Sequence, residues 1–522
     1  MNVSESMSKI HCLVLIPIMF LLLGGCARLP ENSGRTTSFA YAQPEETTIG
    51  KNWEKSFQEN PGDSAYHLLS NGHDALVARV MLAALADHTI DAQYYLLHKD
   101  EVGGIFVDQL YKAADRGVRV RLLLDDMGLE GRDFHGAVMD AHPNIEVRIF
   151  NPFGRNTSRT IQFVTGFGKQ TRRAHNKSFT IDNIATILGG RNIGNEYFIA
   201  DPELDFYDLD VLVVGPVVQE VSGSFDQFWN HELSYPVSTL VEQMPTPEEV
   251  QKIEAEFIEF ISDQQQTEYL ETLKNSKFAQ ILRSGTPEFI WGPGEIVRDD
   301  PQKLATDTDD KTYHLSEELG PYLDEVNNEL LIFSPYFVPG KGGLAYFKKL
   351  REQGVSVKVL TNSLASTDVP IVHSGYANYR RQLLRMGVRL YELNSQLKKE
   401  MERGKFYESK SSLHAKAMVI DRSLVFIGSL NLDPRSVIQN TEIGIVLKSA
   451  EIADRLSMLF DKMVDSIAYR LELRIDQDGF EHIVWHGSVD GENITLYWEP
   501  NTSFWERFSM GFLRLMPAES QL

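Results

Sequence analysis

A repeated pattern constrains this chain more than any other feature of its sequence. The pattern reads His-x-Lys-x4-Asp, and its two copies are His175, Lys177 and Asp182, and His414, Lys416 and Asp421. Asn192 and Asn431 follow the two aspartates at the same offset. One such pattern would be weak evidence, but two complete copies about 239 residues apart in one polypeptide predict two half-sites that meet.

The duplication extends beyond the pattern itself. The spacing of apolar residues predicts strand, helix, strand in both halves: over 89–97, 106–114 and 118–124 in the first, and over 330–338, 344–352 and 355–360 in the second. Arg116-Gly117-Val118 aligns with Gln353-Gly354-Val355 where each helix gives way to the next strand. This order is typical of parallel α/β units, so the sequence predicts two duplicated α/β lobes.

The length of 522 residues is too great for one ordinary core and predicts two or three domains. The expected divisions are a lipoprotein signal peptide over 1–25, a polar tether over 26–60, an N-terminal lobe over 61–240, a helical connector over 241–300, a C-terminal lobe over 301–470 and an extension over 471–522. The charged helix at 247–273 is expected to pack across both lobes.

The C-terminal extension has no counterpart in the first half of the chain. Its last part is expected to form an amphipathic helix with a strongly apolar face. That face carries Phe504, Trp505, Phe508, Phe512 and Leu515. Aromatic residues in such a pattern fit a helix that lies in a lipid interface, and they fit equally a helix docked on its own domain.

The N-terminus carries an export signal. Ser8-Lys9 precedes an apolar run that ends in Leu23-Gly24-Gly25-Cys26. The run has about 11 residues, the length of a signal-peptide core and too short for a membrane-spanning helix. The ending resembles a bacterial lipobox, so Cys26 is expected to carry a lipid and to anchor an exported chain on the periplasmic side of a membrane, with Ala27 favouring the outer membrane. The alternative is an uncleaved anchor, or a plain secretory signal with a chance cysteine.

The net charge of −22 restricts the classes of partner. Nonspecific nucleic-acid binding depends on Lys and Arg side chains that neutralise phosphates, so an acidic chain disfavours it. A local basic pocket can still hold a single phosphate. No nucleic-acid partner is therefore expected, and the sequence leaves the oligomeric state open.

The residue types of the repeated pattern indicate phosphodiester chemistry. In a strand, His and Lys two positions apart point to the same face, so each pair can converge on one ligand. One imidazole would attack phosphorus and form a covalent intermediate, while the other protonates the leaving alkoxide and then activates the acceptor. The oxygens of the phosphate would be held by Lys177, Lys416, Asn192, Asn431 and Ser429. This chemistry needs no metal and no cofactor, and none is expected.

A nucleophilic histidine needs a fixed acceptor for its other ring nitrogen. Asp210 and Glu442 lie in corresponding predicted strands after their histidines, and we assign them this orienting role. Asp182 and Asp421 complete the repeated pattern and are grouped with the catalytic residues. They are expected to brace loops without touching the substrate.

The paired pattern resembles the phospholipase D superfamily, and within it the bacterial cardiolipin synthases of the C type. The segments that carry the resemblance are Ala174-His175-Asn176-Lys177-Ser178-Phe179, Gly189-Gly190-Arg191-Asn192-Ile193-Gly194, Ser334-Pro335-Tyr336-Phe337-Val338-Pro339, Thr361-Asn362-Ser363-Leu364-Ala365, Gly375-Tyr376-Ala377, Leu432-Asp433-Pro434-Arg435-Ser436 and Thr502-Ser503-Phe504-Trp505. The resemblance implies two phospholipase D-like lobes, each a mixed β-sheet flanked by helices, related by a pseudo-twofold with one shared active site.

The same resemblance implies a phosphatidyltransferase at a membrane surface that makes cardiolipin from two phospholipids, with phosphatidylglycerol and phosphatidylethanolamine as the expected partners. His175 would be the nucleophile and His414 the acid and base. Gly190 stands where the second copy has Ser429, so the half-sites are not equivalent. A hydrolytic phospholipase D is the alternative because it shares every one of these residues. A secreted nuclease is disfavoured by the acidic charge, and a scaffold with a degenerate site by the retention of both patterns.

Overall fold

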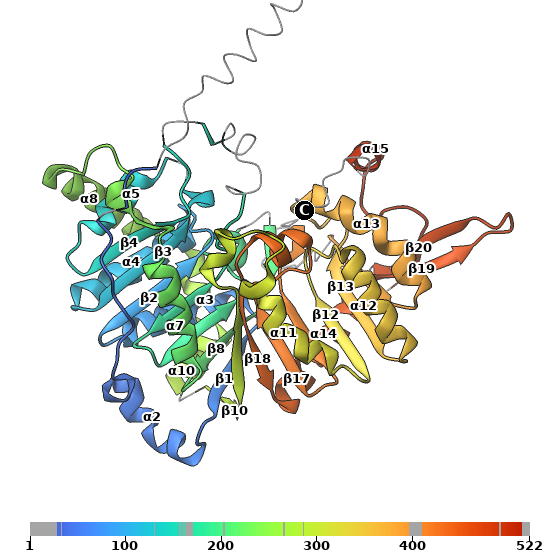
Figure 1. Ribbon diagram of the computed structural model, residues 1–522, viewed down its shortest axis with the longest axis horizontal. Coiled ribbons are helices and arrows are strands. Elements are labelled where there is room, and N and C mark those ends of the chain that lie inside the picture. Colours follow the sequence, from blue (N-terminus) through green and yellow to red (C-terminus); the bar gives the residue numbers. More distant parts are fainter. Residues whose placement is uncertain are drawn as a thin grey trace, which may run out of the picture.

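The computed structural model describes residues 29–513 apart from 33, 130, 156–157, 160–161, 163–170, 202–203, 265–266, 285–286, 396–409 and 490–491. The predicted signal peptide, Cys26, Arg514 and Leu515 lie outside these residues. Two α/β lobes lie side by side, the first from blue to green and the second from yellow to orange (Figure 1). Within the described residues, no helix has the length and apolarity that crossing a membrane requires.

The sheet of the first lobe has the strand order β10-β1-β8-β6-β5-β2-β3-β4-β9. Its strands are β1 (Ser64–Leu69), β2 (Thr89–Tyr94), β3 (Arg119–Asp125), β4 (Ile145–Phe150), β5 (Ser178–Ile181), β6 (Ala185–Gly189), β8 (Asp210–Val214), β9 (Ser234–Pro236) and β10 (Ile290–Gly292). β2, β3 and β4 run parallel, whereas β5 pairs antiparallel with β2. The helices on its faces are α3 (Gly72–Leu85), α4 (Glu101–Asp115), α5 (Asp133–Asp140) and α7 (Val218–Asn230).

The sheet of the second lobe has the order β11-β18-β17-β16-β12-β13-β14-β19-β20-β21. Its strands are β11 (Gly294–Arg298), β12 (Glu329–Phe333), β13 (Ser356–Asn362), β14 (Arg389–Leu393), β16 (Ala417–Ile420), β17 (Leu424–Gly428), β18 (Ile443–Lys448), β19 (Ala468–Ile475), β20 (Glu481–Val489) and β21 (Glu492–Leu496). Its helices are α11 (Leu315–Asp324), α12 (Gly340–Glu352), α13 (Pro370–Arg385), α14 (Ala450–Ser466) and α15 (Phe504–Leu513).

The two sheets repeat one another strand by strand. The run β8-β6-β5-β2-β3-β4 in the first lobe matches β18-β17-β16-β12-β13-β14 in the second. Gly117 (φ 95°) and Gly354 (φ 85°) end α4 and α12 in the same left-handed conformation, which only glycine adopts without strain. The predicted fold of two duplicated lobes with mixed sheets is confirmed. The extension then lengthens the second sheet, because β19, β20 and β21 continue it beyond β14.

A shared apolar core joins the lobes. It contains Leu188 and Val211 from the first sheet packed with Val425 and Ile427 from the second. A separate two-stranded ribbon also crosses between the lobes, because β7 (Leu204–Tyr207) pairs in parallel with β15 (Lys410–Leu413). Strands β6 and β17 are buried along their whole length, which explains why their sequences are apolar apart from Thr186. The lobes therefore form one body around the junction.

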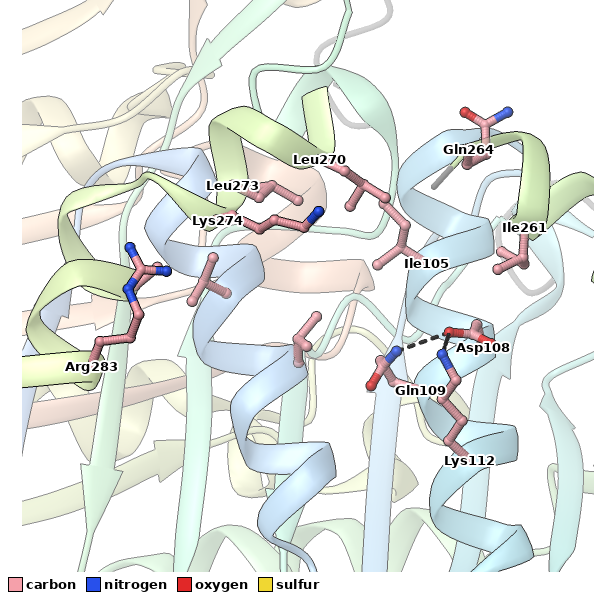
Figure 2. A pocket seen from close by; sticks show the side chains of 13 residues that line it. Ile105, Asp108, Gln109, Lys112, Ile261, Gln264, Leu270, Leu273, Lys274 and Arg283 are labelled. Carbon is pink, nitrogen blue, oxygen red and sulfur yellow. Dashed lines mark hydrogen bonds and ion pairs between the residues drawn. The ribbon is translucent and has the colours of Figure 1, made fainter. Parts of the chain in front are cut away.

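The helical connector differs from the prediction. It forms α8 (Pro247–Gln264), α9 (Glu268–Lys274) and α10 (Lys277–Ser284), and these pack against α3 and α4 of the first lobe instead of bridging both lobes. Leu273 and Phe278 are buried in the core of that lobe. Figure 2 shows the apolar hollow of about 350 Å³ that these helices leave beside α3 and α4, with Leu270, Leu273 and Ile105 facing one another. The hydrophobic side of the connector thus completes the first lobe.

The predicted polar tether is also partly folded. Its last part forms a short 3-10 helix, η1 (Pro44–Glu46), and α2 (Thr48–Glu59), where Trp53 packs edge-on against Phe289 with ring centroids 4.9 Å apart. Upstream of α2, the carbonyl of Ser38 accepts from Arg121 Nη1 at 2.9 Å. Within the described residues the chain therefore lies along the first lobe well before residue 60. Its polar composition reflects an exposed segment that hydrogen-bonds to the lobe's surface.

Candidate active site

The two histidines of the repeated pattern lie at the junction of the lobes, each just before a central strand. His175 precedes β5 and His414 precedes β16. Each is held by the backbone of the opposite lobe: His175 N donates to Thr441 O at 2.9 Å, and His414 N donates to Tyr207 O at 2.8 Å. Both residues are buried. The junction therefore brings the two half-sites together around one site.

The carboxylates that contact the histidines also cross between the lobes. His175 Nδ1 lies 2.9 Å and 3.0 Å from the two carboxylate oxygens of Glu442, and His414 Nδ1 lies 2.6 Å from Asp208 Oδ2. An Nδ1–H that donates to a fixed carboxylate leaves Nε2 with its lone pair. Each imidazole is thus oriented by an acid that belongs to the other lobe.

This arrangement corrects the assignment of Asp210. Its carboxylate pairs with Arg79 at 2.9 Å and with Arg191 at 3.3 Å inside the first lobe, so it braces that lobe and does not orient a histidine. Asp208 takes the orienting place. Glu442 does contact a histidine, but that histidine is His175 of the first lobe and not the one in its own half.

The register of the sheets explains the error. Gly190 N donates to Leu209 O at 3.1 Å and Ser429 N donates to Ile443 O at 2.9 Å, so the residues before those acceptors, Asp208 and Glu442, occupy equivalent positions. Asp208 and Asp210 are two residues apart and both polar. Sequence spacing alone could not choose between them.

The two lysines lie directly beside their histidines. Lys177 Nζ donates to His175 O at 2.7 Å, and Lys416 Nζ donates to His414 O. Lys416 Nζ also lies 2.8 Å from His414 Nδ1, but a ring nitrogen that donates its proton to Asp208 cannot accept another. Burial lowers the pKa of Lys177 to about 7 and that of Lys416 to about 8. Both ammonium groups are therefore close to losing their charge near neutral pH unless an anion enters the site.

The same surroundings lower the pKa of both histidines, and that of His175 falls furthest. Burial, followed by the nearby Lys177 and Lys416, places the pKa of His175 well below its ordinary value. Burial and Lys416 lower the pKa of His414 as well, and Asp208 opposes that shift. A neutral imidazole keeps the lone pair that an attacking nitrogen needs.

The remaining predicted binding residues are arranged unequally. Asn192 Oδ1 accepts from Leu96 N at 3.2 Å and its Nδ2 donates to Tyr197 Oη at 3.0 Å, so this amide braces the loop beside the site. The Nδ2 group of Asn431 lies 3.4 Å from Ser436 Oγ, and its Oδ1 is buried without a hydrogen-bond partner among the described residues. Of these two asparagines, Asn431 is therefore the one with an unsatisfied polar atom.

Ser429 differs from the prediction that it binds substrate. Its hydroxyl donates to Glu442 Oε2 at 2.5 Å and also accepts from Ile443 N at 3.0 Å. The hydroxyl thus fixes the carboxylate that in turn holds His175. Ser429 is a positioning residue that acts through Glu442.

Three aromatic rings beside the histidines were not predicted from the sequence. Tyr95 packs edge-on against His175 with centroids 4.9 Å apart, and Lys177 Nζ lies 5.5 Å from the centre of the same ring. Phe206 stacks on His414 at 5.1 Å, and Tyr197 meets it edge-on at 5.1 Å. These ring contacts limit the rotation of each imidazole about the hydrogen bond between its Nδ1 and the carboxylate. Tyr95 follows β2, Tyr197 ends a 3-10 helix and Phe206 lies in the short strand β7, and none of these positions gave a periodic signal.

The aspartates of the repeated pattern lie at the other end of their strands from the histidines. Asp182 accepts from the backbone amides of Asp87, His88 and Thr89, each at 2.8 Å. Asp421 makes the equivalent contacts to residues 327–329 at 2.7–2.9 Å. Grouping these two residues with the catalytic set is corrected by this placement, because their carboxylates brace the loops that lead into β2 and β12.

One group of side chains among the described residues has metal-ligand geometry. Its members are His98, Asp100 and Glu196, with ligand atoms within 4.8 Å of one another. Asp100 accepts from Gly103 N and from Asn195 N at 2.8 Å each, and His98 Nδ1 lies 3.2 Å from Glu196. These contacts cap α4 and brace the turn at 194–196. The three side chains therefore support the loops at the start of α4 and at 194–196.

Comparisons with known proteins agree with this geometry. The family model described as "Cardiolipin synthase, PLD-like domain" matches residues 81–229 and 321–464, one segment in each lobe. Cardiolipin synthase C of Escherichia coli (strain K12) is 39% identical over 464 residues, which cover 88% of this chain and 97% of that protein. An uncharacterized protein of Helicobacter pylori (strain ATCC 700392 / 26695) is 32% identical and covers 97% of this chain and 98% of its own.

A solved structure shares the fold. The crystal structure of phosphatidylserine synthase from Haemophilus influenzae Rd KW20 superposes with a TM-score of 0.53 over 81% of this chain and 92% of that one. At 13% identity, this likeness concerns the fold alone. Family match and sequence identity together decide the classification: the chain belongs to the cardiolipin synthase family of phospholipase D-like proteins and is an enzyme of the phosphatidyltransferase type.

Proposed function

We propose that this enzyme makes cardiolipin from two phospholipids, transferring a phosphatidyl group between phosphatidylglycerol and phosphatidylethanolamine. The observation that carries the proposal is the pair of buried imidazoles, each fixed through Nδ1 by a carboxylate of the opposite lobe. That arrangement supplies a nucleophile and an acid–base group to one phosphodiester. The relative named cardiolipin synthase C matches 88% of this chain and supports cardiolipin as the product.

The proposed reaction has two displacements at phosphorus. His175 Nε2 attacks the donor phosphodiester and a phosphorus–nitrogen bond forms. The bond to the leaving alkoxide breaks while His414, which enters the step as an imidazolium beside the anionic Asp208, gives the alkoxide its Nε2 proton and becomes neutral. His414 then takes a proton from the hydroxyl of the acceptor lipid. The acceptor oxygen attacks phosphorus and the phosphorus–nitrogen bond breaks, which returns both histidines to their starting state.

Lys177, Lys416 and Asn431 are proposed to hold the nonbridging oxygens. Burial disfavours the charged form of the two lysines, and an anionic phosphodiester bound between them favours that form again. The substrate and the ammonium groups therefore stabilise each other. The buried Oδ1 of Asn431 has no partner among the described residues, and reversal of that amide would aim its NH₂ at the phosphate. Charge in the transition state is thus met by preorganised donors.

The test is incubation of the purified full chain with vesicles of labelled phosphatidylglycerol, with and without phosphatidylethanolamine, followed by lipid chromatography. Labelled cardiolipin that increases when phosphatidylethanolamine is present is expected. Phosphatidic acid without cardiolipin would instead assign the enzyme to hydrolysis by water. The His175→Ala variant supplies the control for uncatalysed exchange.

We also propose that the chain is exported and anchored by a lipid on Cys26, on the periplasmic side of a membrane and preferably the outer one. The supporting observation is the apolar run that ends Leu23-Gly24-Gly25-Cys26. Cells fed labelled palmitate should incorporate label into the chain, and Cys26→Ser should abolish it. Label retained in Cys26→Ser would contradict the anchor, and the fraction that carries the labelled chain reports the membrane.

A further inference from the structure

Helix α15 presents a compact set of aromatic side chains outward. Phe504, Trp505 and Phe508 are 64%, 73% and 63% exposed, and their rings contact one another with centroids 5.6–6.3 Å apart. They face no other element of the described chain closely enough to be buried. Large exposed aromatic patches of this kind mark interaction surfaces.

The helix that carries this patch is firmly held. Ser503 and Glu506 form a reciprocal cap, in which Ser503 N donates to Glu506 Oε2 at 2.6 Å and Glu506 N approaches Ser503 Oγ at 3.2 Å. Met510 is buried, and α15 packs on α13 at the upper edge of the second lobe (Figure 1). The aromatic rings are therefore exposed on an ordered element and belong to its outer face.

A hollow of about 310 Å³ lies beneath α15, between the helix, α13 and β20. Arg381, Arg507 and the exposed Trp498 line it. Arg507 hydrogen-bonds to Thr502, and neither Arg381 nor Arg507 makes an ion pair with a carboxylate among the described residues. Arg381 is close enough to the Glu481 carboxylate to interact with it electrostatically, but it forms no ion pair with it. In a chain with a net charge of −22, two guanidinium groups beside an aromatic patch form a local site for an anion.

This surface adjoins the catalytic end of the second lobe. Leu364 lines the hollow, and two residues earlier Asn362 exchanges hydrogen bonds with the backbone of Leu413 at 2.8–2.9 Å. Leu413 directly precedes His414. The loop after β13 thus connects the hollow to the site, so a surface that receives α15 would lie next to the entrance for substrate.

We propose that α15 is a membrane-docking element: Phe504, Trp505 and Phe508 enter the interfacial region of a bilayer, and Arg381 and Arg507 receive the phosphate of an anionic phospholipid headgroup. Tryptophan and phenylalanine favour the boundary between headgroups and acyl chains, and neighbouring arginines add attraction to anionic lipid. This inference deepens the proposed function, because it assigns the surface that would turn the site toward its lipid substrates.

The first test measures insertion without turnover. The full chain carrying His175→Ala is mixed with vesicles of phosphatidylglycerol and phosphatidylethanolamine brominated in their acyl chains, and quenching of tryptophan fluorescence is recorded. Trp505→Phe should remove at least half of the quenchable emission, whereas Trp291→Phe, a control in the first lobe, should retain it. Equal quenching in the two variants would overturn the docking role, even if the catalytic proposal holds.

The second test concerns the arginines. Arg381→Glu should reduce quenching at least threefold in vesicles that contain phosphatidylglycerol and leave it unchanged in neutral phosphatidylcholine vesicles. Lys252→Glu, a charge reversal at an exposed lysine of α8, should change neither value. Equal losses in both vesicle types, or in both variants, would contradict headgroup recognition by Arg381.

The third test compares substrates. Phe504→Ser with Phe508→Ser should lower the rate on vesicles about tenfold or more relative to the rate on a short-chain phospholipid below its micelle concentration. An unchanged ratio would overturn the proposal. A second outcome would also overturn it: the same two substitutions convert a dimer to a monomer while tryptophan quenching by the vesicles is unchanged. The patch would then be an interface between two copies of the chain. If neither substrate is turned over, the proposed function fails while the quenching result still decides the docking role.

Discussion

The two half-sites keep the same histidine and lysine but support them differently. In the first lobe, Gly190 lies against the carboxylate of Asp208, and a side chain at this position would collide with it. In the second lobe, Ser429 occupies the equivalent position and donates its hydroxyl to Glu442 at 2.5 Å. The second lobe thus uses the longer acid Glu442 with a serine hydroxyl as its partner, and the first lobe uses the shorter acid Asp208 packed against a glycine. The comparison shows that duplication preserved the reacting groups while their supports diverged.

This difference affects the histidine of the opposite lobe in each case, because Glu442 contacts His175 and Asp208 contacts His414. Burial raises the pKa of Glu442 well above its ordinary value, whereas His414 and Lys416 outweigh burial and lower the pKa of Asp208. The anionic Asp208 therefore favours a proton on His414, and His175 lacks an equally strong partner. The asymmetry fits His414 as the acid and base and His175 as the nucleophile.

The largest expected effect separates the two histidines. His175→Ala should remove the covalent intermediate and reduce kcat by about 10⁴-fold or more, and His414→Ala should reduce it by about 10²- to 10⁴-fold while phosphatidyl-enzyme still forms. Labelled donor lipid followed by denaturing gel separation measures the intermediate. His135→Ala, at an exposed histidine, is the control. Label trapped on His175→Ala would reverse the roles of the half-sites.

The next effect tests the crossing of the carboxylates. Asp208→Asn and Glu442→Gln should each lower kcat by about 10³- to 10⁴-fold, because an amide permits the wrong tautomer of the imidazole it contacts. Glu442→Gln should slow formation of the intermediate at His175, and Asp208→Asn should slow its transfer through His414. Asp210→Asn should mainly lower the melting temperature. A larger loss of kcat per folded molecule in Asp210→Asn than in Asp208→Asn would contradict the assignment.

Gly190→Ala should lower kcat by about 100-fold, because the added methyl displaces Asp208 and with it His414. Steady-state kinetics and a thermal melt of the same sample separate this effect from unfolding. Gly223→Ala is the matched control, since a methyl there meets nothing within 4 Å. Full activity in Gly190→Ala would show that a side chain fits beside Asp208 as one does beside Glu442, and would contradict the proposed difference between the halves.

The lysines predict an alkaline limb in the pH profile. Lys177 is charged below its pKa of about 7 and neutral above it, so kcat/KM, which reports the free enzyme, should fall as pH rises through about 7 to 8. Lys177→Arg keeps its charge at high pH and should move this limb upward by about one pH unit, at a cost of up to roughly tenfold in kcat. An unmoved limb in Lys177→Arg would assign the fall to another group.

The smallest expected effect concerns the hydroxyl of Ser429. Ser429→Ala removes one hydrogen bond to Glu442, worth about 1 to 2 kcal/mol, so kcat should fall roughly five- to thirtyfold. Ser429→Thr retains the hydroxyl and serves as the control. A change in KM with kcat unchanged would return Ser429 to the substrate-binding role that its sequence position suggested.

Much of the fold followed from local patterns. The spacing of apolar residues predicted strands over 89–97 and 330–338, and Gly117 and Gly354 marked equivalent helix ends, because these signals depend on neighbours a few residues away. The tether and connector were less accurately predicted. Trp53 and Phe278 pack against the first lobe, and a polar or charged composition around them gives no sign of which surface they will cover.

In the candidate site, too, local patterns identify some residues and miss others. His175, Lys177 and their counterparts are identified by repetition alone, since duplication of a reactive pair is visible without coordinates. The aromatic partners Tyr95 and Phe206 are not, because no periodic pattern marks the residue that follows β2 or a residue of the four-residue strand β7. Choosing Asp208 over Asp210 required the register of β6 against β8, which two nearby acids satisfy equally in the sequence.

The sequence by itself determined two duplicated lobes and the reacting residues that each contributes, because strand period and repeated spacing are local properties of the chain. Only the tertiary structure decided that Glu442 would hold His175 and that Asp208 would hold His414. Contacts between residues more than 200 positions apart depend on how the two sheets pack through their shared core. The geometry of that core brings the two patterns, whose supports already differ at Gly190 and Ser429, together into one asymmetric site.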